Sequence, residues 1–189
     1  RCLSRGLGDV YKRQAQTITN AKGIISTNHT YHGNTALVSQ LSDTNPSSSF
    51  SLNTFKRVFA PDSYRLNGSK NLEEYSRSFA EDIERKINEF KKENIGFAGI
   101  ILCPFFANEG FPNLPNGWLE PAQKIIKKHG GIIIADEVQP GFGRLGSSMW
   151  SHDIIGIQPD IVTIGKPMAN GHPVGCLLYT SPSPRDKHR

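Results

Sequence analysis

The chain has 189 residues, with 22 Lys and Arg against 17 Asp and Glu and a net charge of +5 at pH 7. The excess lies at the ends: residues 1–14 carry +3 and residues 176–189 carry +2, so residues 15–175 hold 15 charges of each sign. A basic chain would indicate binding to nucleic acid or an anionic membrane, and the neutral central part excludes both. No apolar run reaches the roughly 18 residues of a membrane span. Cys103 is the single cysteine of the central part, which excludes a disulfide framework and a metal cluster and suits a cytoplasmic protein.

The two ends are set apart because they resemble translated sequencing adapters. Residues 4–14 read SRGLGDVYKRQ, and residues 176–186 read CLLYTSPSPRD. Segments of that origin are no part of a natural fold. Residues 1–14 and 176–189 are therefore expected to pack against nothing specific.

Short apolar strands alternate with amphipathic helices along the central part. Strands are predicted at residues 23–27 and, more weakly, at 57–60, which Pro61 ends because proline cannot donate to a sheet ladder. A long helix is predicted at about 71–92, where apolar residues recur at steps of three and four and so share one face. Its charged outer face is interpreted as solvated.

The second half of the central part repeats this alternation. A strand is predicted at 97–102 and a helix at 119–129, which Gly130 ends because glycine can adopt a left-handed conformation. Two more strands are predicted at 132–135 and 160–164. Their continuous apolar runs indicate burial on both faces. Strands that alternate with helices predict an α/β fold, a three-layer α/β/α sandwich.

Three of these strands are followed by residues that can do chemistry. Tyr31 and His32 follow the first strand, Asp136 follows strand 132–135, and Lys166 follows strand 160–164. Ligand sites in such sheets gather at the carboxyl ends of the strands. Each residue alone is weak evidence of a site, because a strand-end lysine is usually solvated and a strand-end aspartate usually caps a turn.

Together these residues fit a flat cofactor with a cationic ring nitrogen, bound through an imine. Lys166 would form the imine in its neutral state, and partial burial would lower its pKa. Asp136 would keep the ring nitrogen protonated, so that the ring accepts electrons. Tyr31 would stack on the ring. We therefore expect these side chains to line one cleft.

Two longer runs resemble the class III aminotransferases, a family of fold type I pyridoxal-phosphate enzymes. They are IIIADEVQPGFGRLG at residues 132–146 and PDIVTIGKPMANGHPVG at 159–175. TYHGNT at 30–35 is similar to the family's aromatic-bearing turn. The resemblance implies that residues 15–175 form part of the large, cofactor-binding domain of such an enzyme.

The resemblance also implies roles for particular residues toward pyridoxal 5'-phosphate. Lys166 would form the Schiff base and carry the proton, and Asp136 would pair with the pyridine nitrogen. Gln139 would bond to the phenolic oxygen. Val138 would pack on one ring face and Tyr31 on the other.

Further expectations follow from the same resemblance. His32 would belong to the cofactor-binding residues and lie beside the substrate, whereas Arg144 receives no role. No metal is expected, and the substrates would be an amine and a keto acid. The full-length protein would be a homodimer. One departure concerns substrate recognition, because Cys103-Pro104 stands where many members have Glu-Pro.

Three interpretations stay open. The favoured one is a transaminase, and the alternative is a phospho-lyase that acts on a phosphorylated amino alcohol with the same cofactor. The third is a nucleotide-binding or structural α/β domain without catalysis, although no G-x-G-x-x-G stands directly after a predicted strand and no Walker-type motif is present. The resemblance places the phosphate loop upstream of Ala15 and a small domain downstream of Gly175, so the chain is expected to be an incomplete, inactive fragment.

Overall fold

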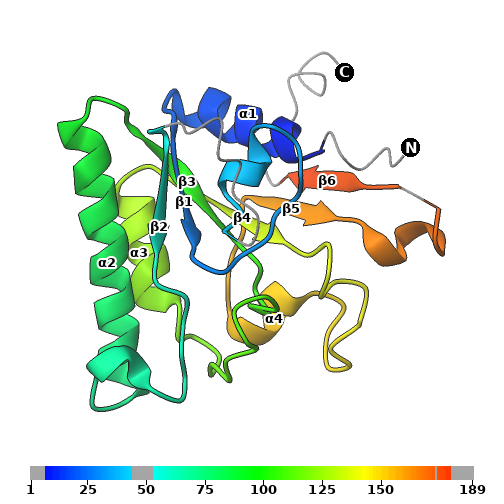
Figure 1. Ribbon diagram of the computed structural model, residues 1–189. Helices are drawn as coiled ribbons and strands as arrows, with labels where there is room; N and C mark the ends of the chain where they lie inside the picture. Colours follow the sequence, from blue (N-terminus) through cyan, green and yellow to red (C-terminus); the bar gives the residue numbers. More distant parts are fainter. Residues whose placement is uncertain (1–6, 44–52, 173, 180–189) are drawn as a thin grey trace.

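The computed structural model describes residues 7–43, 53–172 and 174–179. One mixed sheet lies between helices (Figure 1). The helices are α1 (Leu7–Thr19), α2 (Leu72–Lys92), α3 (Glu120–Lys128) and α4 (Ser151–Ile155), and short 3-10 turns lie at Val38–Gln40, Leu66–Gly68 and Lys166–Ala169. The strands are β1 (Gly23–Thr27), β2 (Phe55–Val58), β3 (Phe97–Leu102), β4 (Ile132–Asp136), β5 (Ile161–Ile164) and β6 (Cys176–Tyr179).

The six strands follow the order β2-β1-β3-β4-β5-β6. The first five run parallel to their neighbours, and β6 is antiparallel to β5. The four main strands predicted from the sequence thus join one sheet, as expected. Because the carboxyl ends of parallel strands meet at one edge, the residues that follow β1, β4 and β5 come together there.

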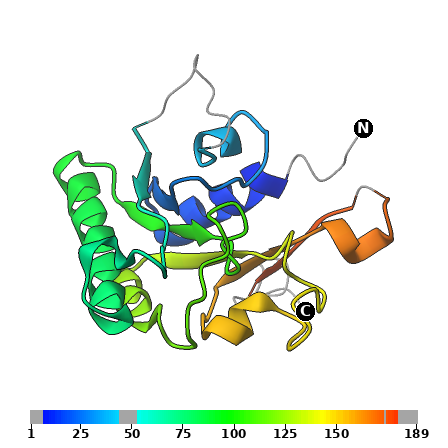
Figure 2. The ribbon, with the colours of Figure 1, turned by 60° about the horizontal axis from the view of Figure 1, so that its bottom comes forward.

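Successive residues of each strand face opposite layers. Ile25, Ile100 and Ile133 are paired in register and pack with α2 and α3. Ile101 and Ile134 are also paired, and they belong to the cluster on the α1 side. Figures 1 and 2 show α2 and α3 together on one side of the sheet and α1 on the other. The predicted α/β/α sandwich is therefore confirmed.

Local sequence explains how α2 is held. The Asn71 side chain accepts a hydrogen bond of 2.9 Å from the Glu74 backbone N–H, which caps the first turn. Lys91 and Lys92 lie in the last turn, where they complement the helix dipole. Tyr75, Phe79, Ile83, Ile87 and Phe90 form its buried stripe.

The expectation that both ends pack against nothing is wrong for Tyr11 near the N-terminus and for residues 176–179. Tyr11 and Ala15 of α1 are 2% and 0% exposed and belong to the core on that side of the sheet. Their spacing of four residues places them on one helix face, and the sheet needs apolar cover there. Cys176–Tyr179 pairs with β5 as strand β6. Residues 1–6 and 180–189 lie outside the described residues, and the adapter origin of both ends stays a prediction.

Smaller differences concern element bounds. The strand predicted at 57–60 is Phe55–Val58, because its register pairs Ile24–Thr27 with those four residues. Helix α4 was not predicted.

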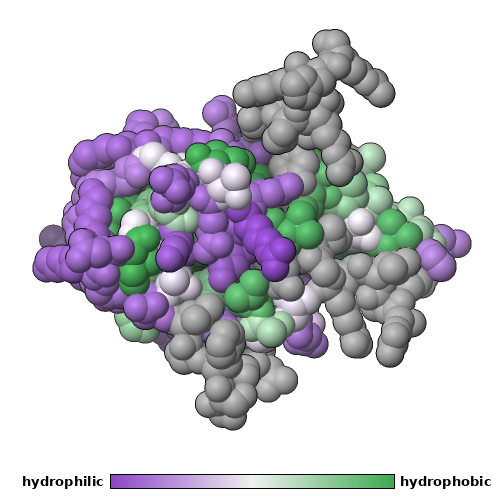
Figure 3. All heavy atoms as spheres, turned by 90° about the horizontal axis from the view of Figure 1, so that it is seen from above, coloured by the Kyte–Doolittle hydropathy of each residue, from purple (hydrophilic) through white to green (hydrophobic). Residues whose placement is uncertain are grey.

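No helix of the described part is long and apolar enough to cross a membrane. Seen from above, that part shows hydrophobic residues in patches among hydrophilic ones (Figure 3).

Candidate active site

A cavity of about 480 Å³ opens at the carboxyl edge of the sheet. This volume lies within the roughly 300–1,000 Å³ of small-molecule sites. All six residues expected at the cofactor line this cavity: Tyr31, His32, Asp136, Val138, Gln139 and Lys166. The expected convergence on one cleft is therefore what the structure has.

Asp136 is the last residue of β4 and is 8% exposed. Its Oδ1 accepts hydrogen bonds of 3.1 Å from the Val138 N–H and from the Thr163 hydroxyl on neighbouring β5. Its Oδ2 lies 2.8 Å from Nδ1 of His32. A carboxylate offers about four acceptor positions, so these three partners leave about one, on Oδ2. A protonated ring nitrogen would fit that position.

His32 belongs to the cavity lining, where its side chain contacts the carboxylate of Asp136. Its side chain is 0% exposed, and its Nε2 lies 3.0 Å from the Thr30 hydroxyl. Because an ionised carboxylate only accepts hydrogen bonds, Nδ1 is the donor in the bond to Asp136. Both ring nitrogens thus contact protein groups, and the place of His32 beside the substrate stays a prediction.

Lys166 is the second residue after the end of β5 and is exposed. The expected partial burial is therefore absent, because the cavity is open on this side. Gly165 precedes it, and a Cβ on Gly165 would come within 3.3 Å of Cγ1 of Val138. This close approach brings the backbone before Lys166 against the turn that carries Val138 and Gln139, both half-buried.

Tyr31 lies in the turn after β1 and is 40% exposed. Gly33 closes this turn with φ of 125°, a conformation that glycine adopts readily and side-chain-bearing residues avoid. The same turn carries His32, so one short segment supplies both an aromatic face and the partner of Asp136.

Some cavity residues escaped the sequence analysis as site residues. Thr163 belongs to the apolar strand β5. Its bond to Asp136 could have been predicted only from the pairing of these two residues on neighbouring strands. Cys103 follows β3, and burial, followed by the charge of Asp136, raises the pKa of its thiol to about 12. Outside the cavity lining, Glu137 is 0% exposed, and its Oε1 accepts hydrogen bonds of 2.8 Å from the Ser151 hydroxyl and the His152 N–H, which tie the turn after β4 to α4. In the described residues no group of three or more His, Cys, Asp or Glu is placed to hold a metal ion.

Comparison with known proteins places this geometry in a family context. The profile of the family described as aminotransferase class-III matches residues 9–182. Two curated relatives are each 30% identical: a Caenorhabditis elegans protein named ethanolamine-phosphate phospho-lyase homolog 1, over 89% of this chain, and a Drosophila melanogaster protein named alanine–glyoxylate aminotransferase 2-like, over 91%. The chain spans 39% and 36% of their lengths.

Solved structures give the same picture. A phospholyase from Arthrobacter in complex with phosphoethanolamine is 29% identical, with a TM-score of 0.83 over 92% of this chain and 41% of that one. An omega transaminase from Pseudomonas jessenii in complex with PMP is 27% identical, with a TM-score of 0.84 over 96% and 42%. Both kinds of enzyme thus share this fold.

Proposed function

Because the chain belongs to the class-III aminotransferase family, we propose that the protein containing it is a pyridoxal-phosphate-dependent transaminase. It would transfer an amino group from an amine or amino acid to a keto acid. One observation carries this proposal: Lys166 and the thrice hydrogen-bonded Asp136 line one cavity at the ends of adjacent strands.

Bound pyridoxal phosphate would supply an aldehyde carbon and an electron-accepting ring. Asp136 would accept the ring N–H at its remaining Oδ2 position. His32, Thr163 and the Val138 N–H already orient this carboxylate. With both oxygens held by these donors, the carboxylate would face the ring nitrogen in a fixed orientation, as a charge-assisted hydrogen bond requires.

Lys166 would act twice, first as nucleophile and then as proton carrier. Its amine would be the group that holds the aldehyde carbon covalently, with the aldehyde oxygen leaving as water. When free, the same amine would accept and return a proton beside the reacting carbon. Tyr31 and Val138 would enclose the ring, and Gln139 would donate to the phenolic oxygen.

The test uses the full-length protein, because the chain spans about two fifths of its relatives. Reduction with borohydride should fix the cofactor to the peptide that contains Lys166. Lys166→Ala should remove the near-visible absorbance and nearly all turnover. Lys124→Ala is the matched control, because Lys124 is exposed on α3 and pairs with Glu120. Full turnover in Lys166→Ala would disprove the proposal.

A phospho-lyase is the second candidate, since one relative and one similar structure carry that name. The same cavity residues would then support elimination of phosphate from a phosphorylated amino alcohol. With phosphoethanolamine and no keto acid, a phospho-lyase releases phosphate, whereas a transaminase needs a keto acid and makes a new amino acid. The expected homodimer is checked by the mass of the full-length protein in solution, and the cytoplasmic location stays a prediction.

A further inference from the structure

The turn that carries Tyr31 and His32, residues 29–33, is irregular, so its backbone groups need partners outside regular secondary structure. Residues 40–43, here called the backing segment, supply four of them. The Asp43 carboxylate accepts from the His29 N–H (3.0 Å), the Asp43 N–H donates to the Thr30 carbonyl (2.9 Å), and the Ser42 hydroxyl accepts from the His32 N–H (2.9 Å) and donates to the Gly33 carbonyl (3.3 Å). The backing segment therefore determines the path of the turn.

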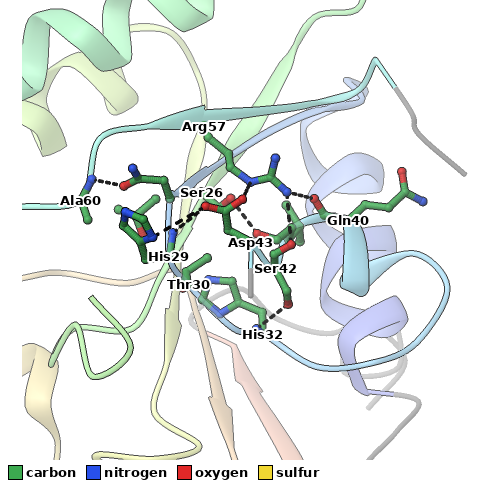
Figure 4. A network of polar contacts seen from close by, with 12 residues as sticks. Ser26, His29, Thr30, His32, Gln40, Ser42, Asp43, Arg57 and Ala60 are labelled. Carbon is green, nitrogen blue, oxygen red and sulfur yellow. Dashed lines mark hydrogen bonds and ion pairs between the residues drawn. The ribbon is translucent and has the colours of Figure 1, made fainter. Parts of the chain in front are cut away.

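Arg57 on edge strand β2 holds the backing segment from the other side (Figure 4). Its guanidinium donates to the carbonyls of Gln40 (2.8 Å) and Ser42 (3.2 Å). Its Nε lies 3.8 Å from Oδ1 of Asp43, whose other oxygen binds the His29 N–H. A planar guanidinium can hold several acceptors in fixed geometry, which a lysine ammonium cannot reproduce.

The neighbouring lysine provides a contrast. Lys56 also lies on β2 and carries the same charge, but it lies 2.6 Å from Glu93 and 3.3 Å from Glu89 of the α2 region. No contact of Lys56 reaches the backing segment in the described residues. Two adjacent cations of one strand thus serve opposite faces of the sheet.

We propose that Arg57 is a positioning residue of the cofactor site. By clamping the backing segment it fixes residues 29–33, and so it sets the stacking of Tyr31 and the bond from His32 to Asp136. The part that concerns the cofactor rests on the proposed function.

The first experiment needs no cofactor. Amide hydrogen exchange of His29, His32 and Asp43 is followed by NMR in the 189-residue chain. Arg57→Met should accelerate exchange at these amides about tenfold or more, because their acceptors lose a charged anchor. Arg57→Lys should show a smaller acceleration, and it provides a folded comparison if Arg57→Met does not fold. Lys56→Met should leave the three amides unchanged; equal acceleration in Lys56→Met, or none in either Arg57 variant, would overturn the clamp.

The second experiment uses the full-length enzyme with pyridoxal phosphate. Arg57→Lys should weaken cofactor binding about tenfold and reduce the near-visible circular dichroism of the bound ring, as Tyr31→Ala should. Faster exchange together with unchanged binding and dichroism would overturn the role at the cofactor while the proposed function stands. If the unmutated enzyme bound no pyridoxal phosphate, the proposed function would fail, and with it the cofactor role of Arg57.

Discussion

The core beneath α2 and α3 and the cavity at the carboxyl edge use the same strands in different ways. In the core, Tyr75 and Phe79 each pack on Trp118 with ring centroids 5.3 Å apart, and apolar contact is the main interaction. At the cavity, buried apolar residues such as Val38 and Ile164 lie beside buried polar ones, and Asp136 has a partner at each oxygen. Strand β4 changes from one regime to the other in a single step, from Ala135 to Asp136.

This contrast indicates that stability and chemistry depend on different residues. Core side chains contribute through the area that they remove from water. Polar side chains at the cavity contribute through the geometry of their hydrogen bonds, because a buried polar group is costly unless it is hydrogen-bonded. Changes in the two regions should therefore give different kinds of effect.

The largest effect is expected at Cys103, and it tests whether the cavity floor is as dry as the core. Cys103 is 6% exposed, and its pKa of about 12 leaves a thousandfold smaller thiolate fraction at pH 8 than a pKa near 9.0 would, to an order of magnitude. Alkylation by iodoacetamide should be about a thousandfold slower than at an exposed thiol. Its rate should still rise about tenfold per pH unit between pH 9 and 10.

Cys176 is the internal comparison, because it is half-exposed in the same chain. Peptide mapping after a timed reaction gives both rates from one sample. Equal labelling of Cys103 and Cys176 at pH 8 would mean that water reaches the cavity floor freely, and the contrast between the two regions would reverse at that point.

The next effect is on stability. Ile83 of α2 is 0% exposed, so Ile83→Ala should lower the free energy of unfolding by about 2–5 kcal/mol through lost burial and a cavity. Tyr31→Ala should cost less than about 1 kcal/mol, because Tyr31 is 40% exposed. Urea unfolding measures both. A larger loss of unfolding free energy in Tyr31→Ala than in Ile83→Ala would show that the cavity residues stabilise the fold more than the core residues do.

Sequence periodicity was sufficient for the core and for part of the site. The apolar stripe of α2 and the continuous strand β4 have local signals, and Asp136 and Lys166 stand at the carboxyl ends of β4 and β5. The partners of these residues were not predictable in the same way. The bonds from His32 and Thr163 to Asp136 join positions 104 and 27 residues apart, and no local pattern encodes them.

The prediction that the two ends pack against nothing was wrong for another reason. Their resemblance to adapters said nothing about packing, yet Tyr11 and Ala15 are spaced for one helix face. Strand β6 depends on the exposed edge of β5, which exists only once the sheet has formed. The role of Arg57 was not predictable either, because its hydrogen bonds to the backing segment go to backbone carbonyls, which every residue has.

The smallest effect is expected on the solvent side of the α2–α3 core, where ion pairs replace apolar contact. Hydrogen bonds from His129 (3.0 Å), and then from Lys128 (3.2 Å), lower the pKa of Glu84 below its usual value. A carboxylate whose pKa is lowered in the folded state adds stability above its unfolded pKa, and this stability is lost as the pH falls through the folded pKa. Glu84→Gln should therefore lower the urea midpoint slightly at pH 7.

The same difference should shrink as the pH falls below the usual pKa of glutamate, about 4.3, and disappear once the pH is below the lowered pKa of Glu84. Glu81→Gln is the control, because Glu81 is exposed three residues earlier on the same helix. The effect is small because exposed ion pairs are screened by water and salt. A loss of stability at pH 7 as large as that of Ile83→Ala would contradict the contrast between buried and exposed residues, since the outer face of α2 would then stabilise the fold as strongly as the buried face.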